Sequence, residues 1–353
     1  IRAQAGITSR GDNPRYLVSA TGGTSFGADD RGHVIVNFSY DRDDGLLSRK
    51  RGISDQDCFL AASPDECGPA SYSSYAAQGR FQLLNANGGA TNAFNGQSLF
   101  TFNPDNSLVS GFPVGYGYNR NAVRRISVPV ERYLASGIVN YDLTDSIRAF
   151  AEVTYAKVKS SSKLEAFALD YTDIYPDGQG IPITNAFIPA DVRAAIAARN
   201  SDGDPANDVT SIGFRRRQVE VFDRSNTNTR DTWRVAVGLN GEFAKGWTFD
   251  ASYVYGQLKD STRSQDIDNA RYRNALDSII VDGQPVCRSA AARADGCVPI
   301  NLFGYGTASP AASAYVQAQI PKSEFIKNTE HVATASISGS LFKLPAGDVA
   351  VAL

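Results

Sequence analysis

The sequence contains no methionine, two histidines and only four cysteines in 353 residues. No uninterrupted apolar run approaches the ~18 residues that a spanning helix needs, which excludes an α-helical membrane protein. Neither sign of charge dominates, because the chain has 35 Lys and Arg and 37 Asp and Glu, for a net charge of -2. The basic residues are scattered rather than gathered in a stripe, so no nucleic-acid partner is predicted.

The two ends of the sequence lack the marks of a complete secreted chain. IRAQAGITSR at the start has neither the basic n-region nor the apolar h-region of a signal peptide. DVAVAL at the end stops inside a predicted strand. We therefore expect the chain to be a piece of a longer protein.

The four cysteines form two local pairs, Cys58 with Cys67 and Cys287 with Cys297, and neither pair has CxxC spacing. The histidines lie far from both pairs in sequence, and the acidic string at 201–208 lacks the carboxylate that closes a calcium loop. Neither a metal site nor a cofactor is therefore predicted. Two loop disulfides formed in an oxidising compartment are the favoured interpretation, and four unpaired cytosolic thiols are the alternative.

What the sequence does contain is a strand pattern, of which 132–159 is one example. Residues alternate with a period of two on both sides of a short turn at 143–146, which indicates a β-hairpin and not a helix. One face is small and apolar with tyrosines at its ends: Tyr133, Ala135, Gly137, Val139, Tyr141, Ile147, Ala149, Ala151, Val153 and Tyr155. The other face carries isolated charges. This combination is typical of a transmembrane β-barrel, apolar towards lipid and polar inwards.

Further hairpins repeat this unit along the chain. The short turns fall near residues 29, 145, 245 and 346. The long irregular segments between them lie near 42–121, 166–230 and 261–328. A soluble sandwich has no reason to gather its long loops at one end, whereas outer-membrane barrels do. We predict an all-β fold class: a transmembrane antiparallel β-barrel domain over 1–353, with about eight strands, short periplasmic turns and long extracellular loops.

The long segments contain local structure of their own. A small hairpin is predicted at 99–112, and a short helix within 185–200, where a proline precedes an Ala-rich run. The basic run at 215–217 could contact an anionic ligand. The favoured interpretation is an extended strand with a solvated face.

Several charged residues fall on the polar faces of the hairpins and are predicted to face the barrel lumen. They are Arg148, Glu152, Arg234, Glu242 and Asp250. Such residues can guide a solute, but pairing across neighbouring strands is the default for a polar lumen face. Arg234 and Asp250 should therefore lie on adjacent strands.

Three hairpins and one loop resemble the barrel of TonB-dependent outer-membrane receptors, the plug-and-barrel family. The hairpins are ERYLASGIVNYDLTDSIRAFAEVTYAKVKS, DTWRVAVGLNGEFAKGWTFDASYVYG and HVATASISGSLFKLPAGDVAVAL. The loop string GCVPINLFGYGTASPAASAYV, at 296–316, is the most specific element. The order of the hairpins together with this string extends the resemblance over nearly the whole chain.

The resemblance implies a 22-stranded barrel, an N-terminal plug and energy-dependent uptake of a scarce solute such as a siderophore, peptide or glycan. No plug, TonB box or aromatic C-terminal strand end is visible here, so a TonB-type complex is expected to act through the missing plug. Other expected partners are outer-membrane lipid, lipopolysaccharide and, optionally, a surface lipoprotein. The implied location is the outer membrane of a Gram-negative bacterium. Cys287 and Cys297 match a loop disulfide of the family.

A passive porin or structural barrel is the alternative function, and it would have inward-pointing loops and no plug. An outer-membrane enzyme is not expected. Its catalytic groups would have to include His33 or His331, and neither stands in a recognisable nucleophile arrangement.

Overall fold

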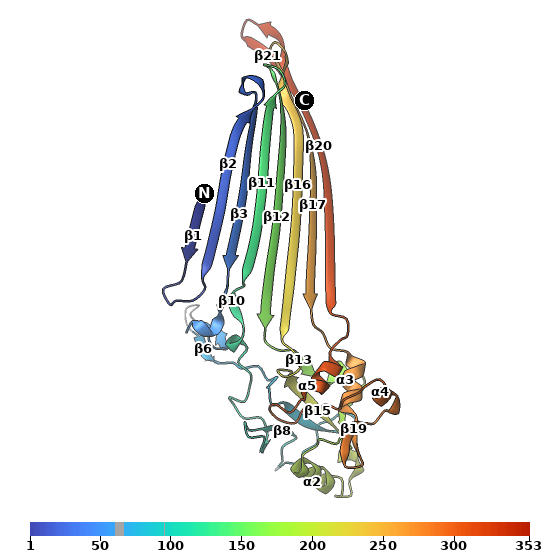
Figure 1. The fold of residues 1–353 in the computed structure, drawn as a ribbon. Helices are drawn as coiled ribbons and strands as arrows, with labels where there is room; N and C mark the ends of the chain where they lie inside the picture. The colour runs from blue at the N-terminus through green and yellow to red at the C-terminus, as the bar shows by residue number, and fades with distance from the viewer. Residues whose placement is uncertain (61–66, 95) are drawn as a thin grey trace.

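The computed structural model describes residues 1–60, 67–94 and 96–353. Within these residues it contains a nine-stranded antiparallel sheet, here called the main sheet, and a smaller folded unit at one end of it, here called the loop domain (Figure 1). The strands of the main sheet, in spatial order, are β1 (Arg2–Gly6), β2 (Arg15–Phe26), β3 (Gly32–Asp43), β11 (Val130–Asp142), β12 (Ile147–Leu164), β16 (Arg224–Ala244), β17 (Trp247–Ser264), β20 (Lys322–Leu344) and β21 (Gly347–Ala352).

Short and long connections alternate along the main sheet. Short turns join β2 to β3, β11 to β12, β16 to β17 and β20 to β21 at one end (Figure 1). At the opposite end, residues 7–14 join β1 to β2, and the three long connections run through the loop domain. The turn before β17 needs Gly246, whose φ of 75° lies in the left-handed region. The predicted all-β class and the four predicted hairpins are thus confirmed.

The period of two separates apolar from polar side chains on the main sheet. Residues directly opposite on adjacent strands form rows, such as Gly137–Val153–Val235–Tyr255 across β11, β12, β16 and β17. The face that holds this row is here called the apolar face, and the opposite one the polar face. The described chain does not cover the apolar face, where Val237 is 45% exposed. A continuous exposed apolar surface of this kind is typical of a face that contacts a membrane or another protein.

Several strands are longer than the sequence pattern predicts. β20 begins at Lys322, well before His331, where the predicted limb started. The added strand β1 pairs with β2. Beyond the apolar rows, both faces of the sheet carry charged and polar side chains. The apolar–polar alternation therefore ends there in the sequence, although the backbone pairing of the strands continues.

The three long connections build the loop domain. Its central sheet consists of β13 (Ala168–Asp170), β15 (Val209–Arg217), β7 (Arg80–Asn85), β8 (Leu99–Phe102) and β9 (Leu108–Ser110), with β14 (Ile181–Pro182) paired to β15. Smaller pairs are β4 (Leu46–Leu47) with β10 (Arg125–Ser127), β5 (Cys58–Leu60) with β6 (Cys67–Ala70), and β18 (Ser278–Val281) with β19 (Gln284–Cys287).

The helices are short. The α-helices are α1 (Tyr171–Ile174), α2 (Ala190–Arg199), α3 (Asn269–Leu276), α4 (Ala290–Ala294) and α5 (Pro310–Val316). The 3-10 turns are η1 (Ala28–Asp30), η2 (Ser48–Lys50), η3 (Arg120–Ala122) and η4 (Pro205–Asn207). The predicted helix and small hairpin are confirmed as α2 and β8–β9. In the parts of the chain that are described, no helix has the length and apolar character to cross a membrane.

The loop domain has an apolar core of its own. Phe81 on β7, Phe100 on β8 and Phe214 on β15 are at most 1% exposed. Phe303, from the third long connection, stacks on Phe81 with ring centroids 4.9 Å apart. All three connections therefore share one core, and they form a folded unit rather than separate loops.

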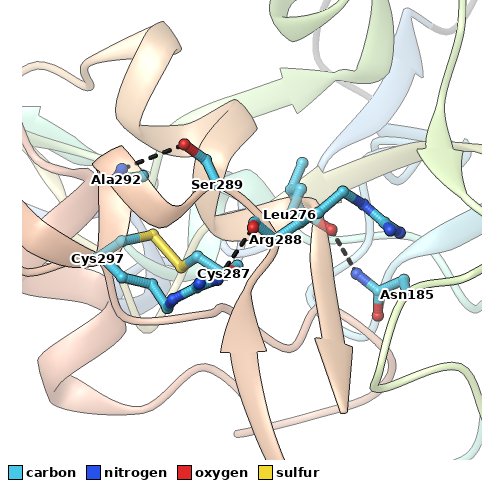
Figure 2. Close-up of a disulfide and its surroundings, with 8 residues drawn as sticks. Asn185, Leu276, Cys287, Arg288, Ser289, Ala292 and Cys297 are labelled. Atoms are coloured by element: carbon cyan, nitrogen blue, oxygen red, sulfur yellow. Dashed lines mark hydrogen bonds between the residues drawn. A yellow bond between two sulfur atoms is a disulfide. The ribbon is translucent and has the colours of Figure 1, made fainter. Parts of the chain in front are cut away.

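One predicted disulfide is present in the loop domain. Cys287 and Cys297 are bonded, with their Cα atoms 6.3 Å apart, and they tie the end of β19 to the segment after α4 (Figure 2). Ser289 caps α4 by accepting a hydrogen bond from the helix backbone, also drawn in Figure 2. The other predicted pair, Cys58 with Cys67, involves a side chain outside the described residues and stays a prediction.

Candidate functional site

The basic run at 215–217 forms the end of β15, an inner strand of the loop-domain sheet. Arg216 is fully buried, and it donates two hydrogen bonds to the Glu220 carboxylate (2.9 and 2.8 Å) and one to the Gly304 carbonyl (3.0 Å). Arg217 is 3% exposed and donates to a backbone carbonyl and a serine hydroxyl. The predicted solvated face is therefore wrong for these two arginines. Carboxylate, carbonyl and hydroxyl acceptors stabilise the two buried guanidinium groups, although the Nε atom of each has no hydrogen-bond partner among the described residues.

Arg215 points away from Arg216, to the face of β15 that Arg217 shares, and it faces a second arginine. It lies directly opposite Arg80 on β7, and it forms an ion pair with Asp170 at 2.6 Å. Among the described residues, the Arg80 side chain has no ion pair or hydrogen bond, and its guanidinium carbon lies 5.4 Å from the ring centre of Phe112. Burial, together with the charge of Arg215, lowers the pKa of Arg80. Two like charges in directly opposite positions destabilise a sheet unless an anion lies between them.

A cavity of about 90 Å³ opens at these arginines, lined also by Gln82, Tyr171 and Gly213. Tyr171 also borders a neighbouring groove of about 510 Å³. That groove is lined mostly by amide, hydroxyl and carboxylate side chains, with Asn85, Asn87, Asp177, Gln179, Thr210 and Ser211 among them. We call the cavity and groove together the arginine site. Its chemistry suits a solute with an anionic group and a polar body, and its volume lies in the range of ligand pockets.

A second charged cluster fixes the loop domain to the end of the main sheet. Glu165 directly follows β12 and is 2% exposed. Its carboxylate lies 2.7 Å from Arg124, 2.7 Å from Arg224 and 3.7 Å from Arg217. Burial works against the carboxylate charge, but the hydrogen bond from Arg124 and the nearby positive charges outweigh it and lower the pKa of Glu165 to about 2. Two long connections thus meet at one carboxylate.

The sequence pattern did not identify Arg80 or Glu165. Arg80 meets Arg215 only through the pairing of β7 with β15, and Glu165 meets Arg124 from 41 residues away. The only local signal was the basic run at 215–217, which indicated the correct strand but not the orientation of its side chains.

The predicted lumen residues lie on the polar face of the main sheet. Arg148 pairs with Asp142 at 2.7 Å, and Arg234 pairs with Glu152 across β16 and β12 at 3.2 Å. Glu242 accepts a hydrogen bond from the backbone of the turn before β17 (2.7 Å). These contacts are the cross-strand and turn pairings expected of a polar sheet face. That this face lines a lumen stays a prediction.

Asp250 lies on β17, next to the strand that carries Arg234, as predicted. The two are not partners, because Arg234 stands opposite Gly256 and Asp250 stands opposite Asn240. The charged groups of the polar face therefore form several local pairs rather than one continuous path.

The two histidines have simple environments. His33 Nδ1 lies 3.2 Å from the Ser25 hydroxyl, and His331 Nδ1 lies 2.6 Å from the Tyr253 hydroxyl. His331 lies within β20, directly opposite Tyr255. The prediction that it begins a strand is therefore wrong. Across the described ranges, neither ring forms an ion pair with a carboxylate, and no group of three or more His, Cys, Asp or Glu side chains could hold a metal ion.

Comparison with known proteins gives distant structural matches alone. No family model matches the chain, and no curated relative does. The siderophore receptor PiuA from Acinetobacter baumannii is 11% identical with a TM-score of 0.30, over 99% of this chain and 39% of the receptor. The ferric-catecholate import receptor Fiu from E. coli K12, in its open form, is 12% identical with a TM-score of 0.27, over 94% of this chain and 45% of the receptor. The chain thus spans less than half of these receptors. Similarity at this level assigns no activity, so the function is argued from the geometry.

Proposed function

We propose that the chain supplies part of the wall and the extracellular loop domain of an outer-membrane β-barrel that actively takes up a scarce solute. The observation that carries the proposal is the combination of two features. One is an uncovered apolar face on a long antiparallel sheet. The other is a folded loop domain, at one end of that sheet, with two facing arginines in a cavity.

The apolar face has the dimensions of a membrane-spanning wall. On β16, the alternate residues of the apolar face run from Trp233 through Gly241 to Phe243. This length matches the ~9–11 residues that a tilted strand needs to cross a bilayer. Aromatic side chains mark both ends of the apolar rows, with Tyr155 and Trp233 towards the loop domain and Phe249 towards the turns. Such aromatic girdles are typical of outer-membrane barrels.

Lipid requires the sheet to close. The outer sides of β1 and β21 have no neighbouring strand among the described residues. Unpaired backbone groups are costly in hydrocarbon, so further strands should pair with both edges and complete the barrel. The 22-stranded barrel, the plug and the TonB-type energy-transducing partner come from the family resemblance of the hairpins and the 296–316 loop.

The arginine site is the proposed point of solute capture. Arg80 and Arg215 carry facing positive charges, and the adjoining groove offers amide and hydroxyl groups. Facing cations with one carboxylate partner favour an anionic solute, such as an anionic siderophore. A rigid core behind β7 and β15 keeps the site preformed, which lowers the entropy lost on binding.

Uptake should depend on energy from the inner membrane. Cells that carry the complete protein are expected to accumulate a radiolabelled ferric siderophore, and a protonophore is expected to stop accumulation while surface binding continues. The control is the same strain without the protein. A passive porin would give uptake that the protonophore does not change, and that result would overturn the proposal.

A further inference from the structure

Tyr171, the first residue of α1, stands between the two parts of the arginine site. It lines both the cavity at Arg80 and Arg215 and the neighbouring groove. Its ring lies against Gly213, where an added Cβ atom would be 3.0 Å from the ring and 3.1 Å from Leu84. The ring and the glycine therefore fit closely, and a side chain at position 213 would press on the ring.

Alternate residues of β15 lead from the cavity to the groove. Arg215, Gly213 and Ser211 lie on one face of the strand, about 7 Å apart from one to the next. Arg215 and Gly213 line the cavity, and Ser211 lines the groove. Because the Tyr171 ring lies at the middle position, a solute that occupies both parts passes the ring about 7 Å from the arginines.

The backbone at Tyr171 is fixed relative to the arginines. The Asp170 carboxylate caps α1 by accepting a hydrogen bond from the Thr172 backbone (3.2 Å). The same carboxylate forms the ion pair with Arg215. Asp173 completes the cap by accepting a hydrogen bond of 2.9 Å from the Asp170 backbone. These contacts preform the passage between the cavity and the groove.

The two parts of the site differ in size. The cavity holds about 90 Å³ and the groove about 510 Å³. A cavity of about 150 Å³ is the size that admits a benzene ring. The arginine cavity is smaller, so it suits a compact oxyanion such as a carboxylate or phosphate, which guanidinium groups bind through paired hydrogen bonds. The larger polar part of the solute fits the groove.

We propose that Tyr171 is a specificity-determining residue, which admits to Arg80 and Arg215 a compact oxyanion at the end of a narrow arm while the polar body of the solute stays in the groove. The proposal rests on the proposed function and deepens it, because it needs the arginines to bind an anionic solute. An oxyanion attached directly to a ring meets Tyr171 before it reaches the arginines. Without the Tyr171 ring, the cavity and the groove join, and both kinds of solute reach the arginines.

The test compares two probes on the complete protein in detergent micelles, with binding measured by saturation-transfer difference NMR. Each probe carries one carboxylate, which glucuronate bears directly on the sugar ring and 6-O-succinylglucose bears at the end of an arm. The unchanged protein and Tyr171→Phe should bind the succinyl probe about 10-fold more tightly, because only that probe reaches the arginines. Tyr171→Ala should bind the two probes with equal affinity. The ratio is measured on one preparation, so partial unfolding of a variant does not alter it.

A second variant tests the contact between the ring and Gly213. Residue 213 lies in extended strand backbone, which alanine adopts readily. Gly213→Ala adds a methyl group that presses on the ring and narrows the passage, so the succinyl probe should bind about 10-fold more weakly. Y171A/G213A should bind this probe nearly as well as Tyr171→Ala, because the two changes act on one contact.

Four results would overturn the inference: equal binding of the two probes by the unchanged protein, a preference that Tyr171→Ala keeps, a preference that Tyr171→Phe loses, or an equal effect of Gly213→Ala with and without the Tyr171 ring. Arg80→Glu separates this inference from the proposed function. If Arg80→Glu weakens both probes and the unchanged protein binds them equally, the inference fails and anion capture stands. If the unchanged protein binds neither probe, or if Arg80→Glu weakens neither, the arginine site fails and the inference fails with it.

Discussion

Replacing Glu165 with alanine is expected to detach the loop domain from the end of the main sheet. The change leaves Arg124, Arg217 and Arg224 close together without their shared carboxylate. Removing one partner of a buried ion pair typically costs about 3–5 kcal/mol. Amide hydrogen exchange in β15 and in the segment before β11 should increase strongly, while exchange in β16 and β17 below the cluster should stay slow.

The matched control is Glu152→Ala on β12, the strand that Glu165 directly follows. Glu152 forms one partly exposed ion pair, with Arg234, and its loss should cost less than about 1 kcal/mol. Equal exchange in Glu165→Ala and Glu152→Ala would show that the cluster does not hold the loop domain.

The Glu165 cluster should also make the attachment sensitive to acid. The pKa of the Glu165 carboxyl is about 2 in the folded protein, below the roughly 4.3 of an unfolded glutamate. A lowered carboxyl pKa stabilises the fold above the unfolded value, and that contribution is lost as the pH falls towards the folded value. The difference in exchange between the unchanged protein and Glu165→Gln should therefore be full near neutral pH. It should shrink from about pH 4 to about pH 2, and a constant difference would contradict the assignment.

Reversing the charge of Arg80 is expected to abolish capture of an anionic solute. A hydrogen bond to a charged group contributes about 1.5–3 kcal/mol, or roughly 10–150-fold in affinity. Arg80→Gln should therefore weaken binding about 10-fold, and Arg80→Glu about 100-fold or more. Binding is measured by tryptophan fluorescence against a panel of ferric siderophores, some anionic and some neutral.

The control for this experiment is Arg49→Glu, an equal charge reversal at an exposed arginine on η2. It should leave the affinity for the anionic siderophores unchanged. Arg80→Glu and the unchanged protein should bind neutral siderophores with the same affinity. Loss of affinity in both arginine variants would indicate a long-range charge effect. That result would remove the arginine site from the account.

The hairpins could be predicted from the sequence because their signal is local. The alternation in β11 and β12 depends on neighbours two residues apart, and the turns at 143–146 and 244–246 break it clearly. The same holds for α2, where the proline and the Ala-rich run are adjacent. One apolar face and one polar face are enough to fix such elements.

The loop domain could not be predicted in the same way. Phe81 and Phe303 stack although more than 200 residues separate them, and no periodic pattern marks either one. The orientation of Arg216 depends on Glu220 and Gly304, which become neighbours only when two long connections fold together. The sequence shows that these segments are long and irregular, but it does not show that they share a core.

The most direct test of the central claim is a spin-label scan of residues 233–241 on β16, in the complete protein reconstituted into lipid bilayers. Collision rates with oxygen, which concentrates in lipid, and with a water-soluble nickel complex are measured at each position. We predict a period of two, with Val235, Val237 and Leu239 reached by oxygen and Arg234, Gly238 and Asn240 reached by nickel or shielded from both reagents. Oxygen contact without alternation, or with the opposite phase, would contradict the account of the main sheet as a membrane wall.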